Sequence, residues 1–262
     1  MSTSFKENKR IGIVYFVYIN SKKNYKRIIK AQLKDLCLSG VLNDASLHLV
    51  VNIADDVNCK QSLSDFFNSL NISFSSITYS EENSFEYEGI KKLYELALSD
   101  KYDYLSYFHT KGMSYRIHLL FKRTPREIVL TFLTFSNYKK IVKLFDNNPK
   151  LNKICPFPSL EDISKNEQWC WFNFYWIRAS YVKHLEIPKK TSDRFYYEHW
   201  TKLINEENSL NSSCSCYSLY SNSYRGFSQS EASQTLRKLG RCYKYLFPVS
   251  RLYLLLNYFI HK

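Results

Sequence analysis

The residues with the clearest chemical potential end an apolar run over positions 102–108. The apolar pattern is replaced abruptly by His109, Thr110, Lys111 and Gly112. The ammonium of Lys111 could bind a diphosphate and stabilise the charge that develops when a nucleoside diphosphate leaves. His109 could hydrogen-bond the same group or ligate a metal, and glycine permits close approach of the backbone. A solvated junction between a strand and a loop contains the same residue types, so composition alone does not separate the two interpretations.

An aromatic stretch over residues 169–185 contains one amide that needs hydrogen-bond partners. Asn173 is flanked by aromatic residues, so we expect its side chain to be buried, where an unpaired amide is costly. A sugar hydroxyl or backbone groups could supply the partners. For the tryptophans of this stretch, Trp169 and Trp171 above all, core packing is the favoured interpretation.

A guanidinium and a carboxylate follow the aromatic stretch. Arg194 and Glu198 are four residues apart, which is one turn of a helix. If the protein is an enzyme that acts on a hydroxyl group, Glu198 can be the general base that takes its proton, and Arg194 can keep Glu198 ionised. Glu88 is the rival carboxylate and could instead bind another part of the substrate. An ordinary surface ion pair explains Arg194 and Glu198 equally well.

The elements that must position these residues alternate between strands and helices. Runs rich in β-branched and aromatic residues predict strands at 11–17, 47–53, 74–79 and 104–108. Amphipathic stretches predict helices from Lys23 to a cap at Gly40, near 62–70 and over 84–98. This alternation predicts an α/β fold with a largely parallel sheet covered by helices on both faces. Ligands bind beyond the carboxyl ends of such strands, which places the HTKG segment at the predicted site.

The rest of the chain is expected to close this domain and to add a tail. Thr124 and Pro125 predict the start of a long helical region, and a short strand is expected near 153–156. We assign residues 1–205 to a catalytic domain and residues 206–262 to a linker and a basic, aromatic helical extension. Such an extension either packs on the main domain or lies on an anionic membrane.

Composition and charge limit the classes of protein. The formal net charge of +13 favours anionic partners such as nucleotides, nucleic acid or an acidic lipid surface. Nucleic acid is not an expected partner, because no motif supports it and the basic residues are spread over all the elements. The seven cysteines are scattered, and the nearest pair, Cys214 and Cys216, lacks the further ligands of a metal site. We therefore expect a reduced protein of the cytoplasm.

The sequence predicts neither a signal peptide nor a membrane-spanning helix. The N-terminal residues are polar and lack the apolar region of a signal peptide. The longest apolar stretch near the other end, residues 252–256, is far shorter than the roughly 20 residues that span a bilayer. The expected location is the cytoplasm, with peripheral contact of the C-terminal tail at the inner face of the membrane.

Four motifs, in this order, resemble those of a known family, the small glycosyltransferase-like proteins of bacteria and large algal viruses. The motifs are FEYEG at 85–89, FHTKG at 108–112, NFYW at 173–176 and R-x-x-x-E-x-W at 194–200. The resemblance covers roughly residues 10–205. It implies a GT-A fold, a nucleotide-sugar donor and a role in building surface or viral glycans or polysaccharide. We therefore expect transfer of a hexose or pentose to a glycan or lipid-linked acceptor. The alternatives are a basic nucleic-acid-binding protein and a non-catalytic sugar-binding relative.

The resemblance also implies roles for individual residues. The implied roles are donor and phosphate binding for Glu88, His109, Thr110, Lys111 and Gly112, substrate binding for Asn173, Trp176 and Arg194, and catalysis for Glu198. Two departures concern the asparagine motif: the usual glycine before the asparagine is Phe172, and the second aromatic position holds Tyr175 rather than tryptophan. Donor or acceptor preference is therefore expected to differ.

Most GT-A enzymes hold a divalent cation with an Asp-x-Asp motif, which this sequence lacks. The HTKG segment takes the corresponding place after the fourth strand. Either Lys111 and nearby basic residues supply the charge of the cation, or Mn²⁺ or Mg²⁺ is bound by an irregular set of ligands that includes His109. We favour the first expectation, in which binding does not require a metal.

Overall fold

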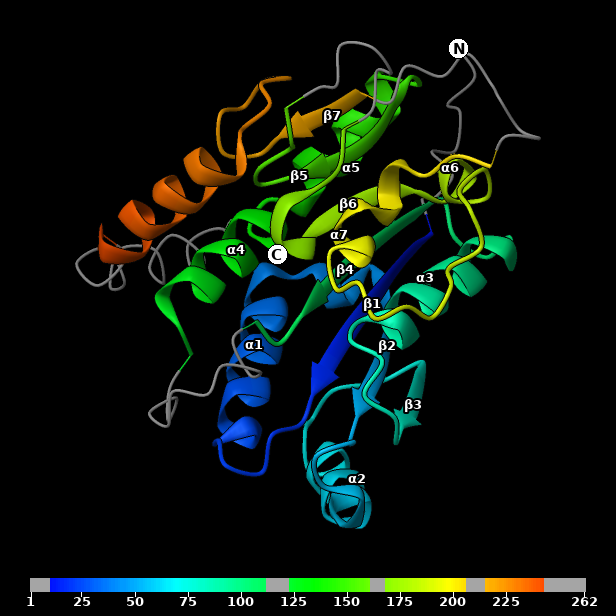
Figure 1. Cartoon of the computed structure of the whole chain (residues 1–262), viewed down its shortest axis with the longest axis vertical. Helices are drawn as coiled ribbons and strands as arrows, with labels where there is room; N and C mark the ends of the chain where they lie inside the picture. Colours follow the sequence, from blue (N-terminus) through cyan, green and yellow to red (C-terminus); the bar gives the residue numbers. More distant parts are fainter. Residues whose placement is uncertain (1–9, 112–122, 161–167, 206–214, 243–262) are drawn as a thin grey trace, which may run out of the picture.

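The computed structural model describes residues 10–111, 123–160, 168–205 and 215–242. Seven strands of these residues form one sheet in the order β3-β2-β1-β4-β6-β5-β7, with helices on both sides (Figure 1). The strands are β1 (Ile11–Tyr18), β2 (Ala45–Asn52), β3 (Ser76–Ser80), β4 (Tyr104–His109), β5 (Leu151–Cys155), β6 (Tyr175–Arg178) and β7 (Ser215–Ser218). The predicted α/β class with a mostly parallel sheet is confirmed, and the architecture is compatible with a Rossmann-like fold.

Within this sheet, β6 runs against the other strands. β1 pairs in parallel with β2 and β4, whereas β6 is antiparallel to both β4 and β5. The amino end of β6 therefore lies at the edge where β1 and β4 end. The chain passes from β1 through β2 to β3 on one side, and then to β4 on the other side of β1. Such a switch point is where open α/β sheets bind ligands.

Burial on both faces explains why the central strands are continuous apolar runs. In β1 and in β4, every residue except the last is buried. Tyr15 and Val17 belong to one cluster of buried side chains, and Val14 and Phe16 belong to a second. Successive side chains of a strand point to opposite faces, so the two clusters are the two faces of the sheet.

The helices divide between these two faces. The first cluster includes residues of α1 (Tyr25–Ser39), α2 (Lys60–Asn68), α4 (Pro125–Phe135) and α5 (Tyr138–Asn147). The second includes residues of α3 (Tyr87–Leu98), α6 (Ala179–Val182) and α7 (Tyr196–His199). Short 3-10 helices are η1 (Val41–Asn43), η2 (Val57–Cys59), η3 (Trp171–Asn173) and η4 (Trp200–Lys202). None of the helices in the described ranges combines the length and the apolar character needed to cross a bilayer.

Local signals in the sequence set several helix boundaries. Gly40 ends α1 in the left-handed conformation expected for it, with φ of 77°. Thr124 caps α4 as expected, because its hydroxyl oxygen accepts a hydrogen bond from the backbone N–H of Glu127 at 3.2 Å. The helical region expected after Thr124 consists of two helices, α4 and α5, because the side chain of Asn137 caps a new start at α5.

The described residues beyond 205 belong to the same sheet and core. β7 pairs in parallel with β5. Ala232 and Leu236 lie on a helix over residues 229–242 and are buried in the cluster that contains α1 and α4. β7, Ala232 and Leu236 therefore share one sheet and one core with segments before residue 205. The rest of the expected tail, residues 243–262, lies outside the described residues.

Candidate active site

The HTKG motif lies at the switch point, and its threonine joins two strand ends. The hydroxyl oxygen of Thr110 accepts a hydrogen bond from the N–H of Tyr18 at 3.0 Å, and its own N–H donates to the carbonyl of Phe16. Thr110 is only 4% exposed. In this arrangement Thr110 fixes the end of β4 against the end of β1. Gly112, the last residue of the motif, lies outside the described residues.

Glu86 is the carboxylate at the centre of the site. Its Oε2 atom accepts hydrogen bonds from Asn173 Nδ2 at 2.8 Å and from the Tyr107 hydroxyl at 3.1 Å. Its Oε1 atom lies 3.8 Å from Nδ1 of His109. Tyr107 is paired with Tyr175 across β4 and β6, so the last residue of β4 lies beside the residues that precede β6. The start of α3, the end of β4 and the turn before β6 thus meet around one carboxylate.

The turn before β6 has a backbone conformation that few residues adopt. Phe172 and Asn173 have φ values of 72° and 52°. Glycine adopts this left-handed region at no steric cost, and glycine is the residue that the resemblance predicts at position 172. In this conformation the carbonyl of Phe172 accepts a hydrogen bond from His109 Nε2 at 3.0 Å. The backbone of Phe172 also acts on the carboxylate of Glu198, where it lowers the pKa that burial raises. One strained residue therefore contacts His109 and influences Glu198.

The imidazole of His109 is held in one tautomer. A carbonyl can only accept, so Nε2 carries the proton of the bond to Phe172, and Nδ1 faces Glu86. Burial lowers the pKa of His109, although the charge of Glu86 opposes this shift. Nδ1 of His109 and Oε1 of Glu86 are two ligand atoms. No third Cys, His, Asp or Glu of the described residues completes a metal-binding group with them.

Lys111 and Glu198 interact electrostatically beside this cluster. Nζ of Lys111 lies 4.8 Å from the ring centroid of Phe172. Burial lowers the pKa of Lys111, and the carboxylates of Glu198 and Glu86 oppose that shift. Burial raises the pKa of Glu198, and the charge of Lys111 opposes it. The site therefore holds a cation, Lys111, and a proton acceptor, Glu198. Burial disfavours the charged form of each side chain when no ligand is bound.

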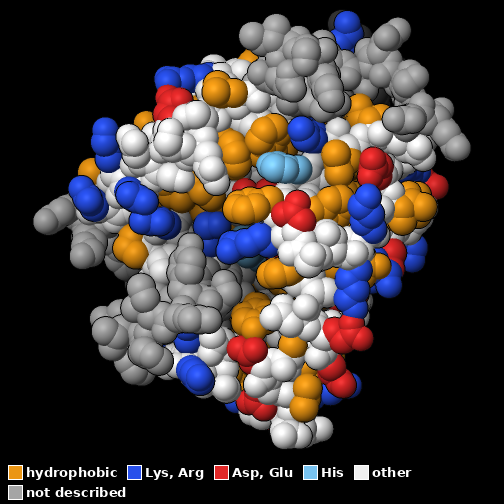
Figure 2. Space-filling model, viewed as in Figure 1, with side chains coloured by type: hydrophobic (Ala, Val, Ile, Leu, Met, Phe, Trp, Pro, Cys, Tyr) orange, Lys and Arg blue, Asp and Glu red, His pale blue; other side chains and the backbone are white. Residues whose placement is uncertain are grey.

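Arg194 lies at the exposed margin of the site. Its guanidinium is 5.7 Å from the ring of Phe195, and its charge acts on both Lys111 and Glu198. Arg194 precedes α7, and Glu198 lies in it. The structure describes both residues, and they do not form an ion pair with each other. Figure 2 shows Lys and Arg side chains near the middle of one face of the molecule, with hydrophobic and acidic side chains beside them.

Two predicted site residues lie elsewhere. Trp176 is fully buried, and its indole N–H donates to the carbonyl of Thr134 at 2.8 Å, so it is a core residue rather than an accessible binding surface. Glu88 lies in the first turn of α3, where its charge acts on Lys190. It makes none of the hydrogen bonds that the carboxylate of Glu86 makes.

Of the two tryptophans for which core packing was the favoured interpretation, Trp171 is buried, with 8% of its surface exposed.

Sequence reasoning missed Glu86 and Tyr107. A signal for both was present in the glycine of FEYEG. A Cβ atom on Gly89 would lie 2.8 Å from the Tyr107 hydroxyl, so α3 approaches β4 too closely for a side chain there. The residue that precedes α3 is consequently brought against the end of β4, and that residue is Glu86.

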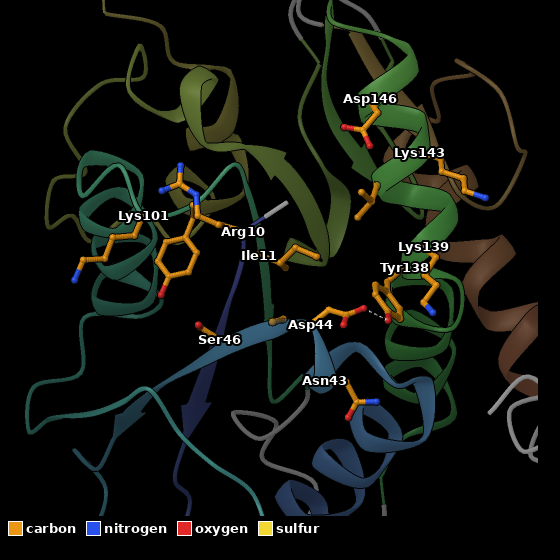
Figure 3. Close-up of a pocket in the computed structure, with 13 residues that line it drawn as sticks. Arg10, Ile11, Asn43, Asp44, Ser46, Lys101, Tyr138, Lys139, Lys143 and Asp146 are labelled. Carbon is orange, nitrogen blue, oxygen red and sulfur yellow. Dashed lines mark hydrogen bonds between the residues drawn. The ribbon is translucent and has the colours of Figure 1, made fainter. Parts of the chain in front are cut away.

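A cavity of about 1090 Å³ lies at the opposite edge of the sheet, where β1 and β2 begin (Figure 3). Its lining includes Arg10, Asp44 and Lys143. The hydroxyl of Tyr138 donates to Asp44 at 2.6 Å within this cavity. The cluster around Glu86 lies at the carboxyl ends of the parallel strands, whereas this cavity lies at their amino ends. This cavity is therefore a competing location for a ligand.

No protein-family model matches this chain, and no curated protein matches it significantly. The fold and the site define an α/β protein with a half-buried, charged site at the switch point of a mostly parallel sheet. A more specific assignment depends on the chemistry of that site and on the motifs described above.

Proposed function

We propose that this chain is a glycosyltransferase of the GT-A type, which moves one hexose or pentose from a nucleotide-sugar donor to an acceptor hydroxyl. The observation that carries the proposal is the meeting of Lys111, Glu198 and Glu86 at the carboxyl ends of the parallel strands. Open α/β sheets bind nucleotides at such a switch point. The strand order, with β6 antiparallel, is compatible with the GT-A fold that the motifs imply.

Lys111 binds the diphosphate of the donor in this proposal. An ammonium beside the departing diphosphate stabilises the negative charge that develops on the leaving group. The half-buried position of Lys111 strengthens that interaction, because water screens it less. The ligand in turn supplies a counter-charge that favours the protonated amine. Arg194 adds a second cation on the solvent side.

Glu198 acts as the general base if the reaction inverts the anomeric carbon. A carboxylate whose pKa is raised by burial accepts a proton more readily near neutral pH than an ordinary glutamate. The charge of Lys111 and the backbone of Phe172 favour the ionised form of this carboxylate. The acceptor hydroxyl would donate its proton to Glu198 as its oxygen attacks the anomeric carbon.

Asn173 offers a hydrogen-bond acceptor to the sugar. Its Nδ2 is bound to Glu86, which fixes the orientation of the amide. Its Oδ1 is buried and has no hydrogen-bond partner. A buried carbonyl oxygen without a partner is costly, and a sugar hydroxyl would satisfy it. Glu86 and His109 are positioning residues in this account, since they hold Asn173 and Phe172.

A divalent cation would find two ligand atoms of the chain at this site, Oε1 of Glu86 and Nδ1 of His109. Mg²⁺ and Mn²⁺ sites in phosphate-binding proteins commonly use one or two protein ligands together with phosphate oxygens. The charge of Lys111 is the alternative to such a cation, and we favour it. The requirement for a metal is therefore part of the test below.

The acceptor is proposed to be a glycan or a lipid-linked glycan reached at the cytoplasmic face of a membrane. Arg237, Lys238 and Arg241 are exposed on the helix over residues 229–242. Each basic residue near an anionic surface contributes about 1 kcal/mol of attraction. These three side chains would favour peripheral contact with anionic lipid.

Thermal stability in the presence of nucleotides tests the donor assignment. A ligand that binds only the folded chain at 100 times its Kd stabilises it by about 2.7 kcal/mol, which is several degrees in Tm. We expect UDP or GDP and one of their sugar conjugates to raise Tm, with or without Mn²⁺. Single-stranded oligonucleotides serve as the matched anionic control. A rise in Tm with oligonucleotides alone would support the nucleic-acid alternative and contradict this proposal.

A further inference from the structure

Three cysteines from distant parts of the sequence lie together in the core. Cys155 is the last residue of β5, Cys216 lies in β7, and Cys170 precedes η3. Their Sγ atoms all lie within 4.8 Å of one another. The distances to Sγ of Cys216 are 3.6 Å from Cys155 and 3.8 Å from Cys170. All three side chains are fully buried. The sequence pattern gave no sign of this cluster, because the nearest pair in the sequence is Cys214 and Cys216 and Cys214 lies outside the described residues.

These sulfur distances suit a shared metal ion better than a disulfide. A Zn–S bond of about 2.3 Å in tetrahedral geometry separates neighbouring sulfur atoms by about 3.8 Å. A disulfide requires about 2.05 Å between the two sulfur atoms. The observed Sγ separations of 3.6 and 3.8 Å therefore leave the three thiols where the ligands of one tetrahedral ion would lie.

A buried cation balances the charge of such a site. Lys153 is fully buried, and its ammonium donates to the carbonyl oxygens of Gln168 and Thr201. No carboxylate of the described residues forms an ion pair with it. Three thiolates, one dication and one ammonium are together neutral, so Lys153 balances the charge of an occupied site.

The charge of Lys153 favours one thiolate at this cluster before any ion binds. Burial raises the pKa values of Cys155 and Cys170, whereas hydrogen bonds from these two thiols and the charge of Lys153 lower the pKa of Cys216. Thiolates, rather than thiols, are the ligands of zinc. The same lysine opposes the rise that burial causes in the pKa of Cys170.

The backbone around the cluster is fixed before any ion binds. β5 and β7 are paired in parallel, and Cys170 is held by a bridge to Pro158. The side-chain oxygen of Gln168 accepts a hydrogen bond from the N–H of Cys216 at 3.2 Å. Ligands that are held by surrounding hydrogen bonds need little rearrangement to bind a metal.

A buried hydroxyl without a hydrogen-bond partner belongs to the same core cluster as the three thiols. It is the hydroxyl of Tyr175, whose pKa is raised by burial and by the charge of Cys170. A buried hydroxyl without a partner indicates an absent ligand or water. Three sulfur atoms leave one position of a tetrahedral ion open, and a water molecule would fill it.

We propose that Cys155, Cys170 and Cys216 bind one Zn²⁺ ion as thiolates in a structural site that joins β5, β7 and the segment before η3. Each thiol that is protonated before binding releases its proton to solvent when it binds the ion. Cys170 immediately precedes η3, which contains Phe172 and Asn173, so the ion would also hold the left-handed turn of the candidate active site. The proposal does not depend on the transferase activity.

Metal content and Co²⁺ substitution test this site on the full-length chain, purified under reducing conditions without chelators. We expect about one zinc ion per chain by elemental analysis. Co²⁺ in place of zinc should give the intense visible bands of a tetrahedral ion and a thiolate-to-cobalt band in the near ultraviolet. A chelator should lower Tm by about 5 °C or more, and Zn²⁺ but not Mg²⁺ should restore it.

Cysteine variants locate the ion. Cys216→Ser should abolish the thiolate-to-cobalt band and the response of Tm to the chelator, whereas Cys59→Ser, a buried cysteine of the other face, should keep both. If Cys216→Ser does not fold, the wild-type metal, cobalt and chelator results decide alone. A folded wild-type chain with neither zinc nor cobalt bands would overturn the proposal, as would cobalt bands that persist in Cys216→Ser or a native disulfide between two of the three cysteines.

Discussion

Replacing Glu198 with glutamine is expected to lower sugar transfer by at least about 100-fold, which is typical of the loss of a general base. Glutamine keeps the size and the hydrogen-bonding shape of the side chain, but it cannot accept a proton from the acceptor hydroxyl. Donor affinity should persist, because Lys111 and Asn173 are unchanged. Initial rates of transfer and a separate binding titration with the donor distinguish the two effects.

Glu88→Gln is the matched control for this substitution. Glu88 was the rival carboxylate in the sequence, but it lies outside the cluster around Glu86. We expect near-normal transfer from this variant. Near-normal transfer by Glu198→Gln would reject the role of Glu198 as the base.

The pH dependence of transfer gives a second readout of the same residue. A base is active when ionised, so the rate should fall as the pH falls through the pKa of Glu198. Burial raises that pKa above the ordinary value of 4.5. In the wild type, the rate of transfer should therefore begin to fall at a pH above 4.5 as the pH is lowered. The slow remaining transfer by Glu198→Gln should not show this fall.

The second large effect is expected for Lys111→Ala, which should weaken the binding of nucleoside diphosphate by about 10- to 100-fold. A hydrogen bond to a charged group contributes about 1.5–3 kcal/mol, and each 1.4 kcal/mol is a factor of ten in Kd. The fold should be retained, because Lys111 follows β4 and belongs to neither cluster of buried side chains. Isothermal titration with UDP or GDP measures the change.

Lys143→Ala removes the same charge from the cavity at the opposite edge of the sheet and is the matched control. Its affinity for diphosphate should equal that of the wild type. If Lys143→Ala weakens binding and Lys111→Ala does not, the diphosphate binds in that cavity and the assignment of the site is wrong.

The sequence predicts the first half of the fold well, for a physical reason. β1 and β4 are buried on both faces, so their apolar runs stand out without any knowledge of their neighbours. β6 and β7 have four residues each, and their positions depend on pairing with residues far away in the sequence. The direction of β6 and the inclusion of β7 in the sheet are therefore not visible in local patterns.

The sequence indicates some residues that lie together at the candidate site and others that lie away from it. It indicates Lys111, because a strand that ends in polar residues marks the carboxyl edge of a sheet. It selects Glu88 rather than Glu86, because the sequence does not fix the residue at which α3 begins. It assigns Trp176 to substrate because aromatic residues serve both cores and sugars, and only the burial of β6 on both faces separates these uses.

Hydrogen exchange in the presence of UDP or GDP at saturating concentration tests the central claim most directly, because it locates the bound nucleotide along the chain. The account predicts slower exchange in peptides that cover residues 85–89, 107–111 and 171–174, which meet around Glu86 at the carboxyl ends of β1 and β4. Peptides that line the cavity at the opposite edge, near Arg10, Asp44 and Lys143, should be unchanged. Slower exchange confined to that cavity, with none at residues 107–111, would contradict the account.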